Sequence, residues 1–141
     1  RLLLPLVRAF SPEILLVSAG FDAHHLDMIS TQQVTDVGYA ALAQRIVHCA
    51  DNICGGKVAM FLEGGYHLDG LGAGVTSFVR QMQTRSTNPV LTPTVNPRHA
   101  TIGAINTTLE KLLPIWPDFA NLGPADQLGP DDPRPGDDYF L

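Results

Sequence analysis

A carboxylate that follows an apolar run is the first candidate for chemistry in this sequence. Asp22 comes soon after the apolar residues 14–17, within the segment SAGFDAH. A buried carboxylate is costly unless it binds a cation or accepts several hydrogen bonds, so Asp22 is a candidate metal ligand. His24 could join it in an Asp-x-His metal-binding fragment. In the alternative interpretation, Asp22 caps the loop and His24 is a polar loop side chain.

A tyrosine behind two glycines is the second candidate. Tyr66 closes the segment EGGY, directly after Gly64 and Gly65. Glycine lets the backbone approach a ligand closely. A phenol at such a place could donate a hydrogen bond to an oxyanion. The alternative is a tyrosine that packs over a tight turn.

The elements that must position these two segments predict a parallel α/β fold. The apolar runs 14–17 and 58–62 are typical of short strands covered on both faces. Because a helical pattern lies between them, we expect a parallel sheet with helices packed against it. Ligands bind outside the carboxyl ends of such strands. Both polar segments follow a strand, so Asp22 and Tyr66 are predicted to face one cleft.

Helix ends are marked by capping residues. Thr35 is a predicted N-cap with Asp36 in the first turn, and the pair Gly55 and Gly56 ends the same helix. Glycines at 70, 72 and 74 weaken the start of the next predicted helix. We expect helices over residues 2–10, 36–54, 68–82 and 100–113.

Composition and charge limit the class of protein. The 141 residues are 45% hydrophobic and 16% charged, which indicates one globular domain or part of one. The net charge of −5 argues against direct nucleic-acid binding, and no apolar run approaches the roughly 18 residues of a membrane span. Cys49 and Cys54 are too few for a disulfide scaffold. They indicate a reduced intracellular protein, and we predict a cytoplasmic one.

The charge of the sequence is concentrated at its carboxy-terminal end. Residues 117–141 contain six Asp and one Arg, which account for the whole net charge. We therefore expect a globular part over residues 1–116 and an acidic tail, rich in Pro and Gly, over residues 117–141. The sequence begins with Arg1 rather than Met, and we expect it to be a piece of a longer protein.

At both polar segments the sequence resembles the histone deacetylase family, especially its bacterial deacetylase-like and acetylpolyamine amidohydrolase branch. The matching residues are ILLVSAGFDAH at 14–24, VT at 34–35, GYA at 38–40 and LEGGY at 62–66. Their order and separation match as well, and the resemblance covers about residues 1–82. It implies part of a three-layer α/β/α parallel-sheet fold like that of arginases and deacetylases.

The resemblance also implies an activity. It implies a zinc-dependent hydrolase that removes an acetyl group from an acetylated lysine or polyamine. Asp22 would be one of three zinc ligands, and Tyr66 would polarise the acetyl carbonyl. The implied substrate-channel residues are Phe21, Ile29, Gly64 and Gly65.

Some family residues are replaced or have no match. Met28 stands where the family commonly has Pro, and His67 where it often has Asn, so the resemblance does not fix the substrate. The other zinc ligands and the catalytic histidines are expected upstream of Arg1, and the 141 residues alone are expected to be inactive. The alternative is a non-catalytic structural or interaction segment that keeps the fold.

Overall fold

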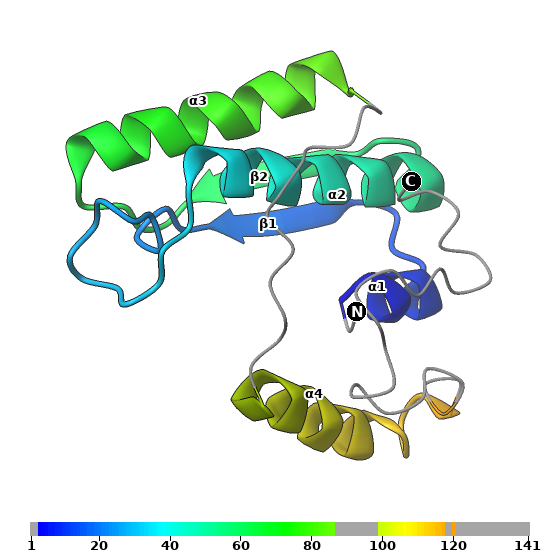
Figure 1. The fold of residues 1–141 in the computed structure, drawn as a ribbon. Coiled ribbons are helices and arrows are strands. Elements are labelled where there is room, and N and C mark those ends of the chain that lie inside the picture. The colour runs from blue at the N-terminus through cyan, green and yellow to red at the C-terminus, as the bar shows by residue number, and fades with distance from the viewer. Residues whose placement is uncertain (1–2, 87–98, 118–119, 121–141) are drawn as a thin grey trace. The chain divides into compact units, whose positions relative to one another are not determined.

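The computed structural model describes residues 3–86, 99–117 and 120 (Figure 1). It divides into two units, which are considered separately: Ser11–Thr92, and Arg1–Phe10 together with Pro93–Leu141. Both candidate segments lie in the first of these units. The elements in chain order are α1 (Leu3–Phe10), β1 (Leu15–Ala19), α2 (Asp36–Cys54), β2 (Val58–Leu62), α3 (Leu68–Thr84) and α4 (His99–Leu112).

The two strands form a parallel pair, as the strand–helix–strand order predicts. Val17 lies beside Met60, and Ala19 lies beside Leu62 at the carboxyl ends. The two strands are the whole sheet in the described part of the chain. Because both end at the same edge, the segments that follow them begin side by side.

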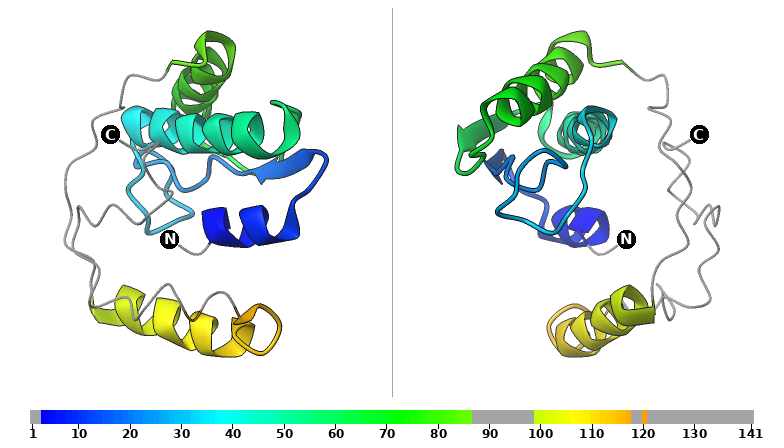
Figure 2. Two further views of the ribbon diagram at one scale, coloured as in Figure 1. Left: turned by 90° about the vertical axis from the view of Figure 1, so that its right-hand side faces the viewer. Right: turned by 60° about the vertical axis from the view of Figure 1, so that its left-hand side comes forward.

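One face of the sheet forms a core with α2 and α3, which lie next to each other (Figure 2). The buried members of this core are Ala19, Phe21, Tyr39, Ala43 and Phe78. Side chains alternate between the faces of a strand, so Leu16 and Phe61 point to the opposite face. They are 67% and 55% exposed. Within the described residues of this unit one face is covered, and coverage of the other face stays a prediction.

The predicted caps of α2 are confirmed. The Thr35 hydroxyl accepts a hydrogen bond from the Gly38 amide at 3.2 Å, and Asp36 stands in the first turn. Gly55 ends the helix in the left-handed conformation with φ 62°, which glycine adopts without steric cost. Its N–H donates to the Ala50 carbonyl. These contacts are local, which is why the sequence pattern predicts them.

The glycines of α3 have a packing role. A Cβ atom at Gly70 would lie 2.7 Å from Nδ1 of His24, and one at Gly74 would lie 2.8 Å from Cδ1 of Phe21. Both glycines are buried, so they let the helix approach the loop after β1 closely. The lower helix propensity of glycine is offset by this contact.

The rest of the chain bears on two further predictions. The last helix, α4, is displaced by one residue from the predicted range 100–113. Most of residues 117–141 lie outside the described residues, so the division at residue 116 stays a prediction. In the described part of the chain, no helix combines the length and the apolar character needed to cross a membrane.

Candidate active site

The segments that follow β1 and β2 are joined by backbone hydrogen bonds. The Phe21 amide donates to the Gly64 carbonyl at 2.7 Å, and the Glu63 amide donates to the Ala19 carbonyl at 3.1 Å. The two polar segments therefore run together beyond the edge of the sheet. This is the place where parallel α/β folds bind ligands.

The carboxylate of Asp22 lies in a cradle formed by two glycines. A Cβ atom on Gly20 would lie 2.7 Å from Oδ1 of Asp22, and one on Gly64 would lie 3.0 Å from the same oxygen. Any larger residue at either position would push against the carboxylate. The side chain is half-buried. The geometry thus places one charged oxygen at the shared edge of the two strands.

Tyr66 presents its side chain to the surface from a fixed backbone. The side chain is 64% exposed. Tyr66 follows Gly64, the glycine that contacts Asp22, by two residues, and successive Cα atoms lie about 3.8 Å apart. The Tyr66 amide donates a 2.7 Å hydrogen bond to Oδ2 of Asp27. Asp22 and Tyr66 are therefore both placed at the same edge of the sheet.

Asp27 is a residue to which the sequence analysis assigned no role, although it lies close to the Asp22 and His24 fragment. The residue is 4% exposed, and its carboxylate accepts three backbone hydrogen bonds. Oδ2 accepts from the amides of Tyr66 and His67 at 2.7 and 3.1 Å, and Oδ1 accepts from Ile29 at 3.1 Å. Its place in a long loop after a strand, and its match to an Asp of the resembled family, were the available signals of such a role.

These hydrogen bonds affect the ionisation of Asp27. The amides of Tyr66 and Ile29 lower the pKa of the carboxyl from its ordinary value of 3.8, against the opposing effect of burial, and the His67 amide adds to the lowering. The folded state therefore favours the charged form. The resulting stabilisation is complete above the unfolded pKa and is lost as the pH falls through the folded pKa.

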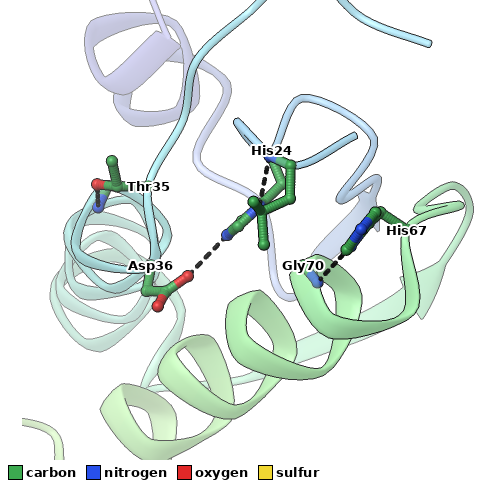
Figure 3. A network of polar contacts seen from close by, with 7 residues as sticks. His24, Thr35, Asp36, His67 and Gly70 are labelled. Carbon is green, nitrogen blue, oxygen red and sulfur yellow. Dashed lines mark hydrogen bonds and ion pairs between the residues drawn. The ribbon is translucent and has the colours of Figure 1, made fainter. Parts of the chain in front are cut away.

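His24 is held by two hydrogen-bond partners, and its contact with Asp36 is drawn in Figure 3. The ring is 1% exposed, and its Nε2 lies 2.7 Å from Oδ1 of Asp36. Its Nδ1 accepts from the Leu26 amide at 3.2 Å. Because that amide can only donate, the proton belongs on Nε2, which donates to Asp36. Both nitrogens are engaged, which favours the interpretation of His24 as a loop side chain.

Phe21 lies in the core. Its ring is 2% exposed, and its centroid lies 4.7 Å from that of Tyr39 and 6.1 Å from that of Phe78. The ring is therefore part of the core in this structure, and the substrate-channel role of Phe21 stays a prediction.

The other three predicted channel residues lie at or near the surface. Ile29 is 68% exposed in the loop after β1. Gly64 contacts Asp22, and Gly65 has a φ of 133° and lies against Leu71 and Phe21. A side chain at Gly65 would be strained by that conformation and would clash as well. A channel role for these three residues stays a prediction.

The different placement of Phe21 and Ile29 predicts different effects on stability. Phe21→Ala is expected to lower the free energy of unfolding by about 3–5 kcal/mol, because it leaves a cavity in the core. Ile29→Ala is expected to change it by no more than about 0.5 kcal/mol. Chemical denaturation of the full-length protein would measure both. An equal effect of the two substitutions would contradict the core position of Phe21.

A metal ion would need ligands in addition to Asp22. Within residues 3–86, 99–117 and 120, no group of three or more His, Cys, Asp or Glu side chains is arranged to hold one. An oxygen of the Asp22 carboxylate, held between Gly20 and Gly64, has the chemistry of a zinc ligand, so the described residues offer one such ligand.

Comparisons with known proteins show which family the chain is similar to. The model of the histone deacetylase domain matches residues 1–82. Histone deacetylase 14, chloroplastic, from Arabidopsis thaliana is 42% identical over 82 residues, which make up 58% of this chain and 19% of that protein. Polyamine deacetylase HDAC10 from Mus musculus is 35% identical over 116 residues, 82% of this chain and 17% of that protein.

A solved structure is similar as well. The crystal structure of the HDA15 HD domain matches with a TM-score of 0.68 and 31% sequence identity, covering 85% of this chain and 30% of that one. The predicted fold class, an α/β fold that is part of the arginase/deacetylase fold, is confirmed. The chain spans about a fifth of the length of these curated relatives. It belongs to the histone deacetylase family.

Proposed function

We propose that the protein containing this chain is a zinc-dependent hydrolase that removes an acetyl or other acyl group from an acetylated lysine or polyamine. The observation that carries the proposal is the Asp22 carboxylate, held between Gly20 and Gly64 at the edge where both strands end. Membership of the histone deacetylase family supports the reaction class. Relatives named histone deacetylase and polyamine deacetylase support the two substrate classes.

Asp22 would provide one ligand of a catalytic zinc ion. Catalytic zinc takes three protein ligands and keeps one position open. When bound, it polarises the amide carbonyl and lowers the pKa of water. We propose that the remaining ligands and the general base belong to parts of the protein outside this chain, so the 141 residues alone would be inactive.

Tyr66 would act on the substrate directly. Its exposed phenol would donate a hydrogen bond to the carbonyl oxygen as negative charge develops there. Gly64 and Gly65, which have no side chains, and the exposed Ile29 would shape the channel that admits the acyl group. The products would be acetate, or the corresponding acid, and the free amine.

A non-catalytic structural or interaction segment is the second candidate. The observation in its favour is that the described residues provide one candidate zinc ligand rather than a complete set. The two candidates differ in what the full-length protein does. Neither requires contact with a membrane or with nucleic acid.

An activity assay with metal removal tests the proposal. The full-length protein is incubated with an acetyl-lysine peptide or an acetylated polyamine, and released acetate is measured. We expect activity that is lost on treatment with a chelator and restored by zinc. Absence of activity in protein shown to contain zinc would favour the non-catalytic candidate, and activity in the 141 residues alone would refute the proposed division of the site.

The compartment is a separate part of the proposal. We propose a cytoplasmic protein, supported by Cys49 and Cys54, which are both buried and are not joined in a disulfide. Microscopy of the tagged full-length protein would test it.

A further inference from the structure

We propose that Asp27 is a positioning residue for Tyr66, and that its carboxylate fixes the backbone from which the phenol is presented. The inference rests on the proposed function of Tyr66. Asp27 itself has no contact with substrate in this scheme and acts through the tyrosine.

The hydrogen bonds of Asp27 join the loop after β1 to the backbone of Tyr66 and His67. One oxygen, Oδ2, accepts from two successive amides, those of Tyr66 and His67, across 39 and 40 residues of sequence. Hydrogen bonds to a charged acceptor are stronger than those between neutral groups. Because Asp27 is 4% exposed, water has little access with which to replace these bonds. The position of the Tyr66 backbone is thus set by a side chain of the other loop.

The second oxygen extends the link to the proposed channel rim. Oδ1 accepts from the Ile29 amide at 3.1 Å. A single carboxylate therefore connects the backbone of Ile29 with that of Tyr66. One buried carboxylate therefore holds the backbone of two residues whose side chains are exposed.

Asp27 is itself anchored to the core of the unit. Its amide donates to the His24 carbonyl at 2.8 Å, and the His24 ring is held by Asp36 in the first turn of α2. On the other side of Tyr66, Nδ1 of His67 caps α3 by accepting from the Gly70 amide at 3.2 Å (Figure 3). Tyr66 therefore lies between two fixed points, although its own side chain is exposed.

A carboxylate fits this arrangement better than its amide analogue. All three partners are N–H donors, and an ionised carboxylate only accepts. In Asp27→Asn the side-chain NH2 group must face either Ile29 or the pair Tyr66 and His67. In both orientations a donor meets a donor, and at least one buried amide loses its partner. The substitution therefore loosens the site with almost no change in side-chain volume.

Two measurements on the full-length protein test the positioning role. Asp27→Asn is expected to speed hydrogen exchange of the Tyr66 and His67 amides about tenfold or more, the effect of losing a hydrogen bond to a charged group. It is expected to lower kcat by about 10- to 100-fold, because small displacements of a reacting group cost rates of that order. KM and zinc content should stay close to those of the wild type.

Control variants separate positioning from general damage. Asp69→Asn removes an exposed carboxylate from the first turn of α3 and should leave both exchange and kcat unchanged. Asp27→Glu keeps an acceptor-only group and should recover part of both effects. If Asp27→Asn does not fold, Asp27→Glu supplies the comparison, since its longer side chain displaces the Tyr66 backbone and should still reduce kcat more than KM changes.

The outcomes distinguish this inference from the proposed function. Unchanged exchange at Tyr66 and His67, or faster exchange with wild-type kcat, would overturn the positioning role. A proportional loss of zinc and activity would overturn it as well. A wild-type protein without deacetylase activity would instead refute the proposed function, and the exchange comparison would still decide whether Asp27 holds the Tyr66 backbone.

Discussion

Tyr66→Phe in the full-length protein is expected to lower kcat by about 100- to 1000-fold, the usual loss when one donor to a developing oxyanion is removed. The phenol is 64% exposed, so the loss of its hydroxyl should leave the core and the stability unchanged. Zinc content should also stay at the wild-type level, because the phenol is not a proposed ligand. Steady-state kinetics and metal analysis of the same preparation would measure both quantities.

Tyr39→Phe is the matched control for this prediction. It also removes a single tyrosine hydroxyl, from a ring that packs in the core against Phe21. Burial, with the Asp22 charge as a second cause, raises the pKa of Tyr39, so its hydroxyl is not an acid near neutral pH. We expect kcat of this variant close to that of the wild type. Near-wild-type turnover in Tyr66→Phe would remove the proposed role of Tyr66.

Gly64→Ala is expected to weaken zinc binding by about 10- to 100-fold, a loss typical of disturbing the groups around a metal ligand. The added methyl group would lie 3.0 Å from Oδ1 and 3.2 Å from Cγ of Asp22, so the carboxylate must move. Gly64 is not among the residues with positive φ, so the substitution acts through this contact rather than through backbone strain. Asp22→Ala, which removes the carboxylate, should have a larger effect.

Gly72→Ala is the control for Gly64→Ala, because it adds the same methyl group to a glycine that does not contact Asp22. A Cβ atom there meets nothing within 4 Å, and the residue lies inside α3. Zinc affinity should not change, and the free energy of unfolding should rise by up to about 1 kcal/mol, because alanine favours the helix. Competition with a chromogenic chelator would give the affinities. Equal zinc affinity in Gly64→Ala and the wild type would contradict the glycine cradle around the metal ligand.

The parts of the fold that depend on nearby residues could be predicted from the sequence. Thr35 and Gly55 cap α2 through contacts within a few residues, and the run 58–62 coincides with β2. The parallel pairing followed from the order of the elements. The position of Asp22 and Tyr66 after two such strands was therefore predictable as well.

The parts that depend on contacts between distant residues could not be predicted. Asp27 meets Tyr66 across 39 residues, and nothing in the local sequence indicates that a loop aspartate will accept from that amide. Gly70 weakens a helix by propensity, but its role is to let α3 approach His24. Phe21 adjoins Asp22 in the sequence, yet its ring enters the core because of rings contributed by α2 and α3.

The central claim is that Asp22 and Tyr66 serve one zinc site, and a crystal structure of the full-length protein with zinc and an acetylated substrate analogue tests it most directly. The account predicts an Asp22 oxygen at about 2.0–2.2 Å from zinc. It predicts the Tyr66 hydroxyl within about 2.6–3.2 Å of the acyl carbonyl oxygen. A zinc ion bound without Asp22, or a Tyr66 phenol directed away from the bound carbonyl, would contradict it.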